Sequence, residues 1–217
     1  MKVNVFNDGF VELVDTMGDD LKVVNTARVS YGKESKDFTD KDMKLLHYLW
    51  EHEHTSPFRH CFLSFRIRAP IFVLRQWMKH QIGCSWNEQS ARYTELKHGC
   101  FTPDVWRYQD TKNKQSSQGA IEDQGQAFDL MNDVYELAYT NYEKLLDMGV
   151  CREQARIVLP VAVYSECIWT TSLQGLMHFI ELRADKASQY EIQLYAQAVR
   201  ELAYDQFKNS IDLLDKK

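Results

Sequence analysis

Residues 75–93 read RQWMKHQIGCSWNEQSARY, the part of the chain with the densest mixture of polar chemistry. Its functional side chains are those of Gln76, Lys79, His80, Gln81, Asn87, Glu88, Ser90 and Arg92. Cationic, hydroxyl and amide groups suit a phosphate and the alternating donors and acceptors on the edge of a pyrimidine. The stretch therefore predicts a nucleotide site, although a surface helix running into a polar loop would have a similar composition.

The flanking patterns indicate how this stretch is held. Residues 61–68 alternate between apolar and polar side chains, which predicts a strand, and Pro70 favours the first turn of a helix. On that helix Gln76 and His80 are four residues apart and should share a face. After Gly83 we expect a loop, in which alternation turns Glu88, Ser90 and Arg92 to one side.

Periodicity predicts further elements along the chain. The expected strands are residues 2–6, 10–14 and 161–171. The expected helices follow Asp19 or Asp20, then cover about 39–52, 121–147, a short piece of 149–160, the segment after Ser172, and about 188–207. Thr39 with Asp42 resembles a capping box, Ser172 is a predicted N-cap, and residues 212–217 should fray.

Composition limits the classes of protein. The 217 residues include 26 Lys and Arg against 31 Asp and Glu, so the net charge of -5 argues against broad binding of nucleic-acid backbones. No apolar run is long enough for a membrane span, and we expect a soluble protein. The five cysteines form no C-x-x-C pair, which favours a reducing cytoplasm, that of a host cell if the source is viral.

Two arginines outside the central stretch, Arg156 and Arg183, are candidate functional residues. Arg156 lies in ARIVLP, where a lone arginine is usually a surface residue. Arg183 continues the apolar stripe of its helix through Leu176 and Ile180, so it needs an internal partner. An ion pair between Arg183 and Glu181 or Asp185 would meet that need without any catalytic role.

Three histidines raise a different possibility. His52, His54 and His60 lie close together in HEHTSPFRH, residues 52–60, and could be imagined as ligands of a hydrolytic metal. No carboxylate at helical spacing completes a known zinc pattern, and Pro57 interrupts the segment. A metal-dependent hydrolase is therefore the weakest hypothesis, and we expect no metal site.

The order KHQ, IGCS and WNEQSARY resembles the signature of the flavin-dependent thymidylate synthases (the ThyX family), which typically runs RHR, a short spacer and NExSxRY. The resemblance extends over most of the chain and is weak at 95–125 and in the C-terminal tail. It is carried outside the central motif by GFVELVDTMG, TARVS, APIFVLRQW, ARIVLP and LRAD.

The resemblance implies an α+β fold in which a mostly antiparallel sheet is flanked by long helices. It implies one domain over 1–217, with a variable polar insertion around 97–120. It further implies an enzyme that methylates dUMP to dTMP with 5,10-methylenetetrahydrofolate as carbon donor, NADPH as reductant and FAD as cofactor, releasing tetrahydrofolate. Members of the family are homotetramers whose sites are shared between subunits.

The resemblance also assigns site residues by position. The implied dUMP contacts are Gln76, Lys79, Glu88, Gln89, Ser90, Ala91, Arg92, Arg156 and Arg183. The implied FAD contacts are Ser30, Ser56, Lys79, His80, Gln81, Glu88, Ser172, Leu173, Gln174 and His178. Arg183 is the expected catalytic residue, because a guanidinium at the uracil edge favours loss of the N3 proton and makes the ring carbon more nucleophilic.

This chain departs from the family pattern near the cofactor. Lys79 and Gln81 replace arginines, Gln174 stands where arginine is common, and Arg59 stands where an acid is common. The spacer after His80 is one residue longer than usual. The changes at Lys79 and Gln81 would each weaken phosphate binding by about 1 kcal/mol, and His80 and Gln174 could compensate through hydrogen bonds. The same departures motivate an alternative, a catalytically impaired nucleotide-binding protein of the same fold.

Overall fold

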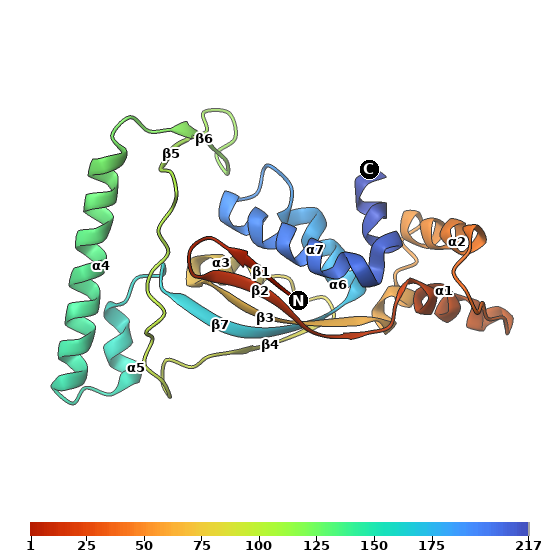
Figure 1. Ribbon diagram of the computed structural model, residues 1–217, viewed down its shortest axis with the longest axis horizontal. Helices are drawn as coiled ribbons and strands as arrows, with labels where there is room; N and C mark the ends of the chain where they lie inside the picture. Colours follow the sequence, from red (N-terminus) through yellow and green to blue (C-terminus); the bar gives the residue numbers. More distant parts are fainter. Residues whose placement is uncertain (217) are drawn as a thin grey trace.

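The computed structural model describes residues 1–216, and a five-stranded antiparallel sheet with the order β1-β2-β3-β7-β4 forms its centre (Figure 1). The strands are β1 Lys2–Val5, β2 Gly9–Met17, β3 Phe62–Pro70, β4 Cys84–Glu88 and β7 Tyr164–Ser172. β3 and β7 pair along their whole length, so two segments about 100 residues apart in sequence form the middle of the sheet. β4, the end of the central sequence stretch, pairs with β7 at the sheet edge.

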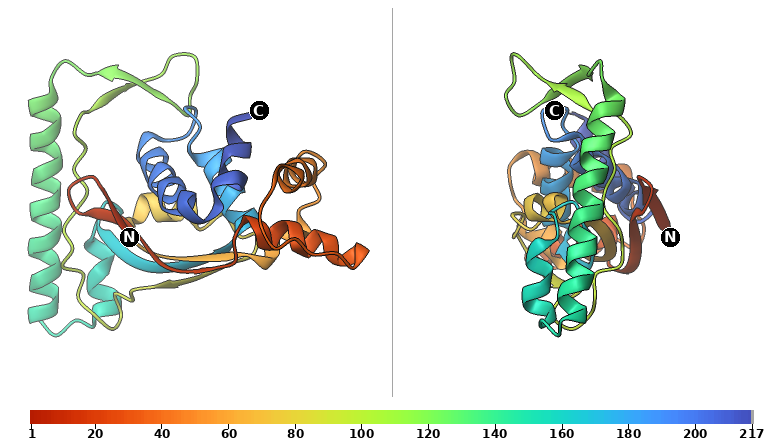
Figure 2. Two further views of the ribbon diagram at one scale, coloured as in Figure 1. Left: turned by 45° about the vertical axis from the view of Figure 1, so that its right-hand side comes forward. Right: turned by 90° about the vertical axis from the view of Figure 1, so that its left-hand side faces the viewer.

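The helices lie in separate groups around the sheet (Figures 1 and 2). They are α1 Asp20–Arg28, α2 Asp40–Glu51, α3 Ile71–Trp77, α4 Gln124–Asp147, α5 Arg152–Ala155, α6 Leu173–Arg183 and α7 Tyr190–Asp212. Short 3-10 turns are η1 Val29–Tyr31, η2 Ser56–His60, η3 Arg156–Val158 and η4 Leu213–Lys216. α6 and α7 cover one face of the sheet, α1 and α2 lie at one end, and α4 stands at the opposite end.

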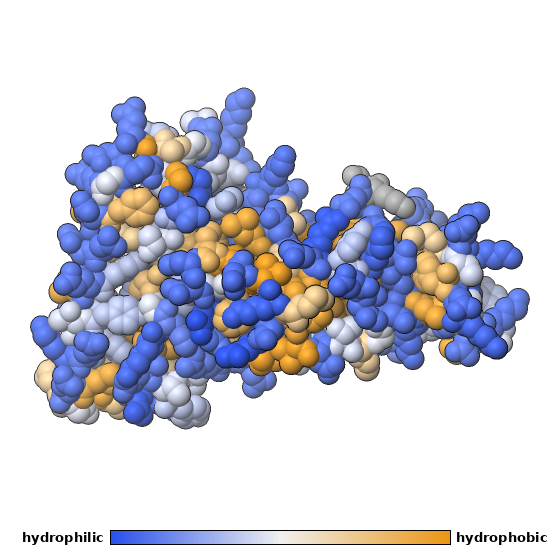
Figure 3. Space-filling view, viewed as in Figure 1, coloured by the Kyte–Doolittle hydropathy of each residue, from blue (hydrophilic) through white to orange (hydrophobic). Residues whose placement is uncertain are grey.

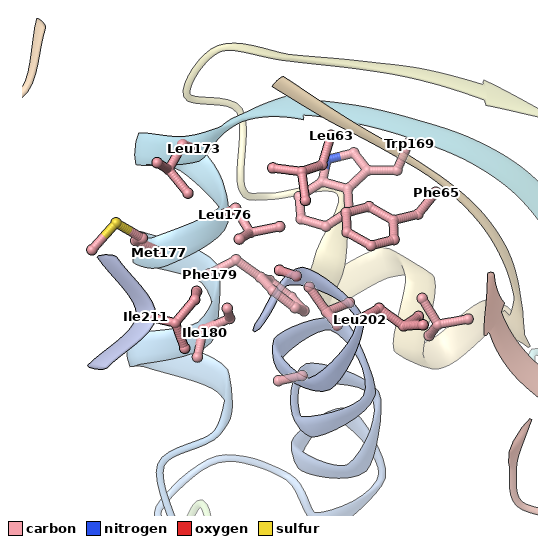
Figure 4. Packing of buried hydrophobic residues seen from close by; sticks show 14 of the residues in the cluster. Leu63, Phe65, Trp169, Leu173, Leu176, Met177, Phe179, Ile180, Leu202 and Ile211 are labelled. Atoms are coloured by element: carbon pink, nitrogen blue, oxygen red, sulfur yellow. The ribbon is translucent and has the colours of Figure 1, made fainter. Parts of the chain in front are cut away.

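The core lies between the sheet and the α6–α7 layer (Figure 4). Trp77 from α3 is fully buried and stacks on Phe179 of α6, with ring centroids 4.6 Å apart. Trp169 of β7 meets both rings edge-on at 5.3 Å. Burial of such large apolar surfaces is the main force that fixes α3 and α6 against the sheet, and with them the residues at the C-terminal end of each helix.

Several local predictions are confirmed. The first two strands are present, and the second extends to Met17. The Asp19 side chain caps α1 by accepting from the Lys22 N–H at 2.7 Å, and Thr39 forms the expected capping box with Asp42. Ser172 caps α6. The α+β fold with an antiparallel sheet and long helices is likewise as the sequence implied.

The central stretch differs from its prediction in two respects. The helix that begins after Pro70 ends at Trp77, so His80 does not share a helical face with Gln76. Residues 84–88 form a strand rather than a loop, because β7 offers them an open sheet edge. The predicted alternation then stops at Ser90, whose carbonyl accepts hydrogen bonds from the backbone N–H groups of Tyr93 and Thr94 in a turn.

The C-terminal prediction is wrong where the structure describes it. Residues 213–216 form η4, and Leu213 is only 2% exposed. The buried Asp20 carboxylate accepts hydrogen bonds from Asn209 and Ser210, which holds the end of α7 against α1. Arg200 pairs with Asp215 at 2.5 Å. Residue 217 lies outside the described residues.

The polar segment around 97–120 contains a small hairpin, β5 Arg107–Gln109 with β6 Ser117–Ala120. The neighbouring α4 exposes Leu130, Val134 and Leu137, which are 57–64% accessible in one chain. Hydrophobic residues also gather near the middle of the surface in Figure 3. Within residues 1–216, no helix combines the length and apolar character needed to cross a membrane.

Candidate functional site

Arg183 lies at the C-terminal end of α6, where its helix meets the end of α3. It lines a pocket of about 690 Å³ together with Gln76 and Gln189, which we call the Arg183 pocket. The Arg183 Nε donates to Nε2 of His80 over 2.8 Å, a bond between residues far apart in sequence. The internal partner that the apolar stripe required therefore includes a histidine.

His80 is held neutral in this arrangement. Its side chain is buried, and burial together with the neighbouring Arg183 and His178 lowers its pKa from 6.5 to about 4. A neutral imidazole that accepts at Nε2 carries its proton on Nδ1. That Nδ1 is buried without a hydrogen-bond partner, so the ring retains one unused donor.

A chain of polar side chains supports the other wall of the Arg183 pocket. The Gln76 amide donates to Gln189, and Gln189 in turn donates to Glu191 at 2.7 Å. The Glu191 carboxylate is 5% exposed and pairs with Arg107 at 2.6 Å. Because each member is hydrogen-bonded, the amide of Gln76 is fixed beside Arg183.

A second pocket, of about 280 Å³, lies where β4 leaves the sheet beside η3. We call it the Arg156 pocket. The residues that carry its polar chemistry are Glu88, Gln89, Ser90, Arg156 and Ser165. Ser165 donates to the Glu88 carboxylate at 2.7 Å and so fixes it. Arg156 is exposed and forms no ion pair with any described residue, which leaves its charge available to an anion.

The predicted dUMP residues thus divide between two pockets that share no lining residue. Gln76 and Arg183 line one, and residues 88–91 with Arg156 line the other. Arg92 points to neither and pairs with Glu153 at 3.3 Å, with both side chains more than half exposed. Lys79 is exposed and lines neither of these two pockets. One chain therefore does not assemble the whole set in one place.

A third pocket, of about 540 Å³, lies between α1, the end of α2 and η2. We call it the Arg59 pocket. It brings together Ser30 and Ser56, two of the predicted FAD contacts, although they are separated by α2. Arg59 extends from it to Gln174 on α6, donating from Nε to the amide oxygen at 2.6 Å. Through Arg59, this bond connects the pocket that holds Ser30 and Ser56 with Gln174, another predicted FAD contact, on α6.

Comparison with known proteins gives the family. The model of the thymidylate synthase complementing protein family matches residues 12–207. A flavin-dependent thymidylate synthase of Thermosipho africanus is 47% identical over 198 residues, covering 90% of this chain and 86% of that protein. One of Thermus thermophilus is 45% identical over 202 residues, covering 93% of this chain and 74% of that protein. This chain belongs to the flavin-dependent thymidylate synthase family.

A solved structure agrees with this assignment. The UMP/dUMP methylase PolB of Streptomyces cacaoi, in its complex with 5-Br dUMP, superimposes with a TM-score of 0.88 at 33% identity. The match covers 99% of this chain and 97% of that chain. The complex of the same methylase with 5-Br UMP gives a TM-score of 0.87.

The other predicted flavin contacts of this thymidylate synthase are arranged unevenly. Ser172 and Leu173 are fully buried, the first as the α6 cap and the second in the core, so their side chains are used within the chain. His178 lies beside His80, with ring centroids 5.9 Å apart. Gln81 is exposed, and no hydrogen bond ties its side chain to another described residue.

Four of the five cysteines of this thymidylate synthase are poor candidates for a nucleophile. The Cys84 thiol donates to the His80 carbonyl oxygen at 3.0 Å. Burial raises the pKa of Cys61 and of Cys100 to about 11 and also raises that of Cys167. A thiol with a raised pKa carries little of the reactive thiolate at pH 7.

The histidine segment gives no support to a hydrolytic metal. His52 stacks on Tyr48 with ring centroids 4.1 Å apart, and its ring lies 6.4 Å from that of His54. His54 and His60 line the Arg59 pocket instead. Over residues 1–216, no three potential metal-ligating side chains come together in one group.

Three site residues were not assigned from the sequence. Ser165 positions Glu88, Gln189 positions Gln76, and Arg59 contacts Gln174. Of the three, only Arg59 could have been noticed in the sequence, because it stands where the family commonly has an acidic residue. Ser165 lies in a predicted strand and Gln189 at the start of a predicted helix, and neither pattern indicates a site. The partners of both residues are more than 75 residues away in sequence.

Proposed function

We propose that this chain methylates dUMP to dTMP, taking the carbon from 5,10-methylenetetrahydrofolate and the reducing equivalents from NADPH through bound FAD. The observation that carries the proposal is that Arg183, which lines a polar pocket, is held by a hydrogen bond to neutral His80. The structural neighbour is a methylase of UMP and dUMP, which supports the substrate class.

Arg183 is the proposed catalytic residue. A guanidinium that donates to the uracil edge stabilises the negative charge that develops when the N3 proton is lost. The negative charge spreads into the ring and makes its C5 carbon nucleophilic, so no cysteine attack is needed. The Gln76 amide, fixed through Gln189, can supply an additional donor or acceptor to the same edge.

His80 is the proposed positioning residue for Arg183. Because the imidazole accepts the Nε–H, the two terminal nitrogens of the guanidinium remain directed away from it. A protonated imidazole has no acceptor nitrogen and would also repel the arginine. The lowered pKa of His80, about 4, keeps the accepting form present at neutral pH.

The Arg156 pocket supplies the proposed phosphate contacts. Its unpaired guanidinium and the Ser90 hydroxyl match the acceptor oxygens of a nucleotide phosphate. No described base is hydrogen-bonded to the Ser90 hydroxyl, which accepts from the Arg92 N–H at 3.2 Å, so Ser90 acts as a ligand rather than a nucleophile.

The residues around the Arg59 pocket fit a flavin dinucleotide. Ser30 and Ser56 offer hydroxyl donors, and Arg59 offers a cationic donor. Bound FAD would supply the hydride transfer that converts the transferred carbon into a methyl group. Lys79, Gln81 and His178 complete the proposed cofactor surface.

A homotetramer is proposed for the working enzyme. Gln76 with Arg183 and Arg156 with residues 88–91 lie in separate pockets of one chain, so a shared site between copies would unite them. The exposed apolar residues Leu130, Val134 and Leu137 of α4 offer a surface for such assembly.

The test begins with the absorption spectrum of the protein after FAD is added and the excess removed. Anaerobic NADPH should bleach the retained flavin, faster with dUMP present, and methylenetetrahydrofolate should then yield dTMP, measured by mass spectrometry. Failure to retain flavin while dUMP still binds would replace this proposal with the nucleotide-binding alternative, which the altered Lys79 and Gln81 motivate.

A further inference from the structure

Arg59 is a charged residue to which the sequence assigned no site role. It lies on η2, exposed at the rim of the Arg59 pocket. Its Nε donates to Gln174 Oε1 at 2.6 Å, and its Nη2 donates to the Thr55 hydroxyl at 3.1 Å. Two bonds to separate segments fix the plane of the guanidinium, while Nη1 has no hydrogen-bond partner among the described residues.

The charge of Arg59 is not neutralised within the described part of the chain. None of its nitrogens lies within ion-pair distance of a described carboxylate, although Glu53 lines the same pocket. Gln174, its partner on α6, is uncharged and uses its amide oxygen as the acceptor. The pocket therefore has one fixed positive charge, and the hydroxyl-bearing residues Ser30 and Ser56 also line it.

We propose that Arg59 binds the diphosphate of FAD and that Gln174 orients it for this contact. The proposal rests on the proposed function, which supplies the dinucleotide. The diphosphate is the anionic part of FAD, and a planar guanidinium with free N–H groups can bind two of its oxygens at once. The surrounding hydroxyls add neutral donors to the same group.

The placement of the charge is the distinctive part of the proposal. Gln174 belongs to α6, and the hydrogen bond to it places the guanidinium between the N-terminal helices and α6. The same positive charge could equally be provided from the α6 side, by an arginine at 174 facing a glutamine at 59. An exchange of the two side chains should therefore preserve the site, whereas removal of the charge should not.

The experiment measures the dissociation constant of FAD by quenching of flavin fluorescence on the intact protein. R59Q should weaken FAD binding about tenfold, because a charge-assisted contact is lost. R59Q/Q174R should recover affinity to within about threefold of the unmodified chain, since the guanidinium returns from the other side. R59K keeps the charge without the planar fork and should fall between them.

A matched control separates this contact from a general loss of charge. Lys44 is exposed on the same N-terminal pair of helices and does not line the pocket, so K44Q should leave FAD affinity unchanged. The salt dependence of FAD binding should be smaller in R59Q than in the unmodified chain, because one ionic contact is missing. Thermal unfolding confirms that each variant is folded.

Two results would overturn the assignment. One is R59Q binding FAD as tightly as the unmodified chain, which would leave the proposed function intact. The other is a double variant no better than R59Q alone, which would mean that the residue acts through local structure and not through charge in the pocket. Absence of FAD binding by the unmodified chain would instead overturn the proposed function and this assignment with it.

Discussion

Arg183 and Arg156 are both assigned to the substrate, yet their surroundings differ. Arg183 is partly buried at the end of α6 and is tied to His80 by a 2.8 Å hydrogen bond. Arg156 is exposed on the short turn η3 and has no ion-pair partner among the described residues. One guanidinium is oriented before any ligand arrives, and the other is free to move.

The difference matches the two proposed tasks. Stabilising charge that develops in a reacting ring requires a donor held in place beforehand, because reorientation during the reaction costs free energy. Holding a phosphate that is fully charged throughout requires attraction, which tolerates a mobile side chain. The comparison therefore predicts that changes near Arg183 lower the rate, while changes near Arg156 weaken substrate binding.

Replacing Arg183 by alanine should have the largest effect. We expect R183A to reduce the rate of dTMP formation by about 100- to 1000-fold or more, the range for removing a preorganised donor. The protein should stay folded, as measured by circular dichroism and thermal unfolding. If the R183A variant formed dTMP at the unmodified rate, Arg183 would have no catalytic role, and the predicted difference between Arg183 and Arg156 would be wrong.

Acidification should act through His80. Its folded pKa, about 4, lies below its ordinary value of 6.5, so the unfolded chain takes up this proton first as the pH falls. The free energy of unfolding should therefore decrease between pH 6.5 and pH 4, by about 2 kcal/mol from this group. Urea unfolding at a series of pH values measures the loss.

His80→Gln provides the matched variant for that measurement. A glutamine amide oxygen can accept from Arg183 but does not titrate, so H80Q should show a shallower dependence of unfolding free energy on pH over the same interval. An unchanged pH profile in H80Q would mean that other groups cause the acid sensitivity, and that the histidine does not hold Arg183 through its neutral form.

Arg156→Gln should change binding rather than rate. We expect the KM for dUMP to rise about tenfold with kcat within about twofold, as for loss of a contact made equally before and during reaction. Arg152→Gln, an exposed arginine one turn earlier that does not line the pocket, is the control. A large fall in kcat for R156Q would instead mean that Arg156, like Arg183, acts in the chemical step.

The smallest expected effect comes from Gln189→Ala. This change frees the Gln76 amide, which donates to Gln189, without touching either arginine. We expect kcat/KM to fall about threefold, the cost of one neutral hydrogen bond of modest strength. Steady-state kinetics with dUMP as the varied substrate measure it, and an effect as large as that of R183A would show that the polar chain from Arg107 does more than orient an amide.

The local features of this fold could be read from the sequence because their causes lie within a few residues. The cap at Asp19, the capping box at Thr39 and the alternation in β3 each depend on neighbours in the chain. Errors arose where a distant segment decided the outcome. β7 turned residues 84–88 into a strand, and Asp20 held the C-terminal residues that should have frayed.

The sequence by itself determined the family and therefore the identity of the residues that carry the chemistry, since the order of residues in the central motif is a local property. Only the tertiary structure decided which of them meet. Arg183 is hydrogen-bonded to His80, and Arg59 is hydrogen-bonded to Gln174. Arg156 lines a separate pocket. These pairings follow from how α6 packs on the sheet, because burial of Trp77 and Phe179 sets that position.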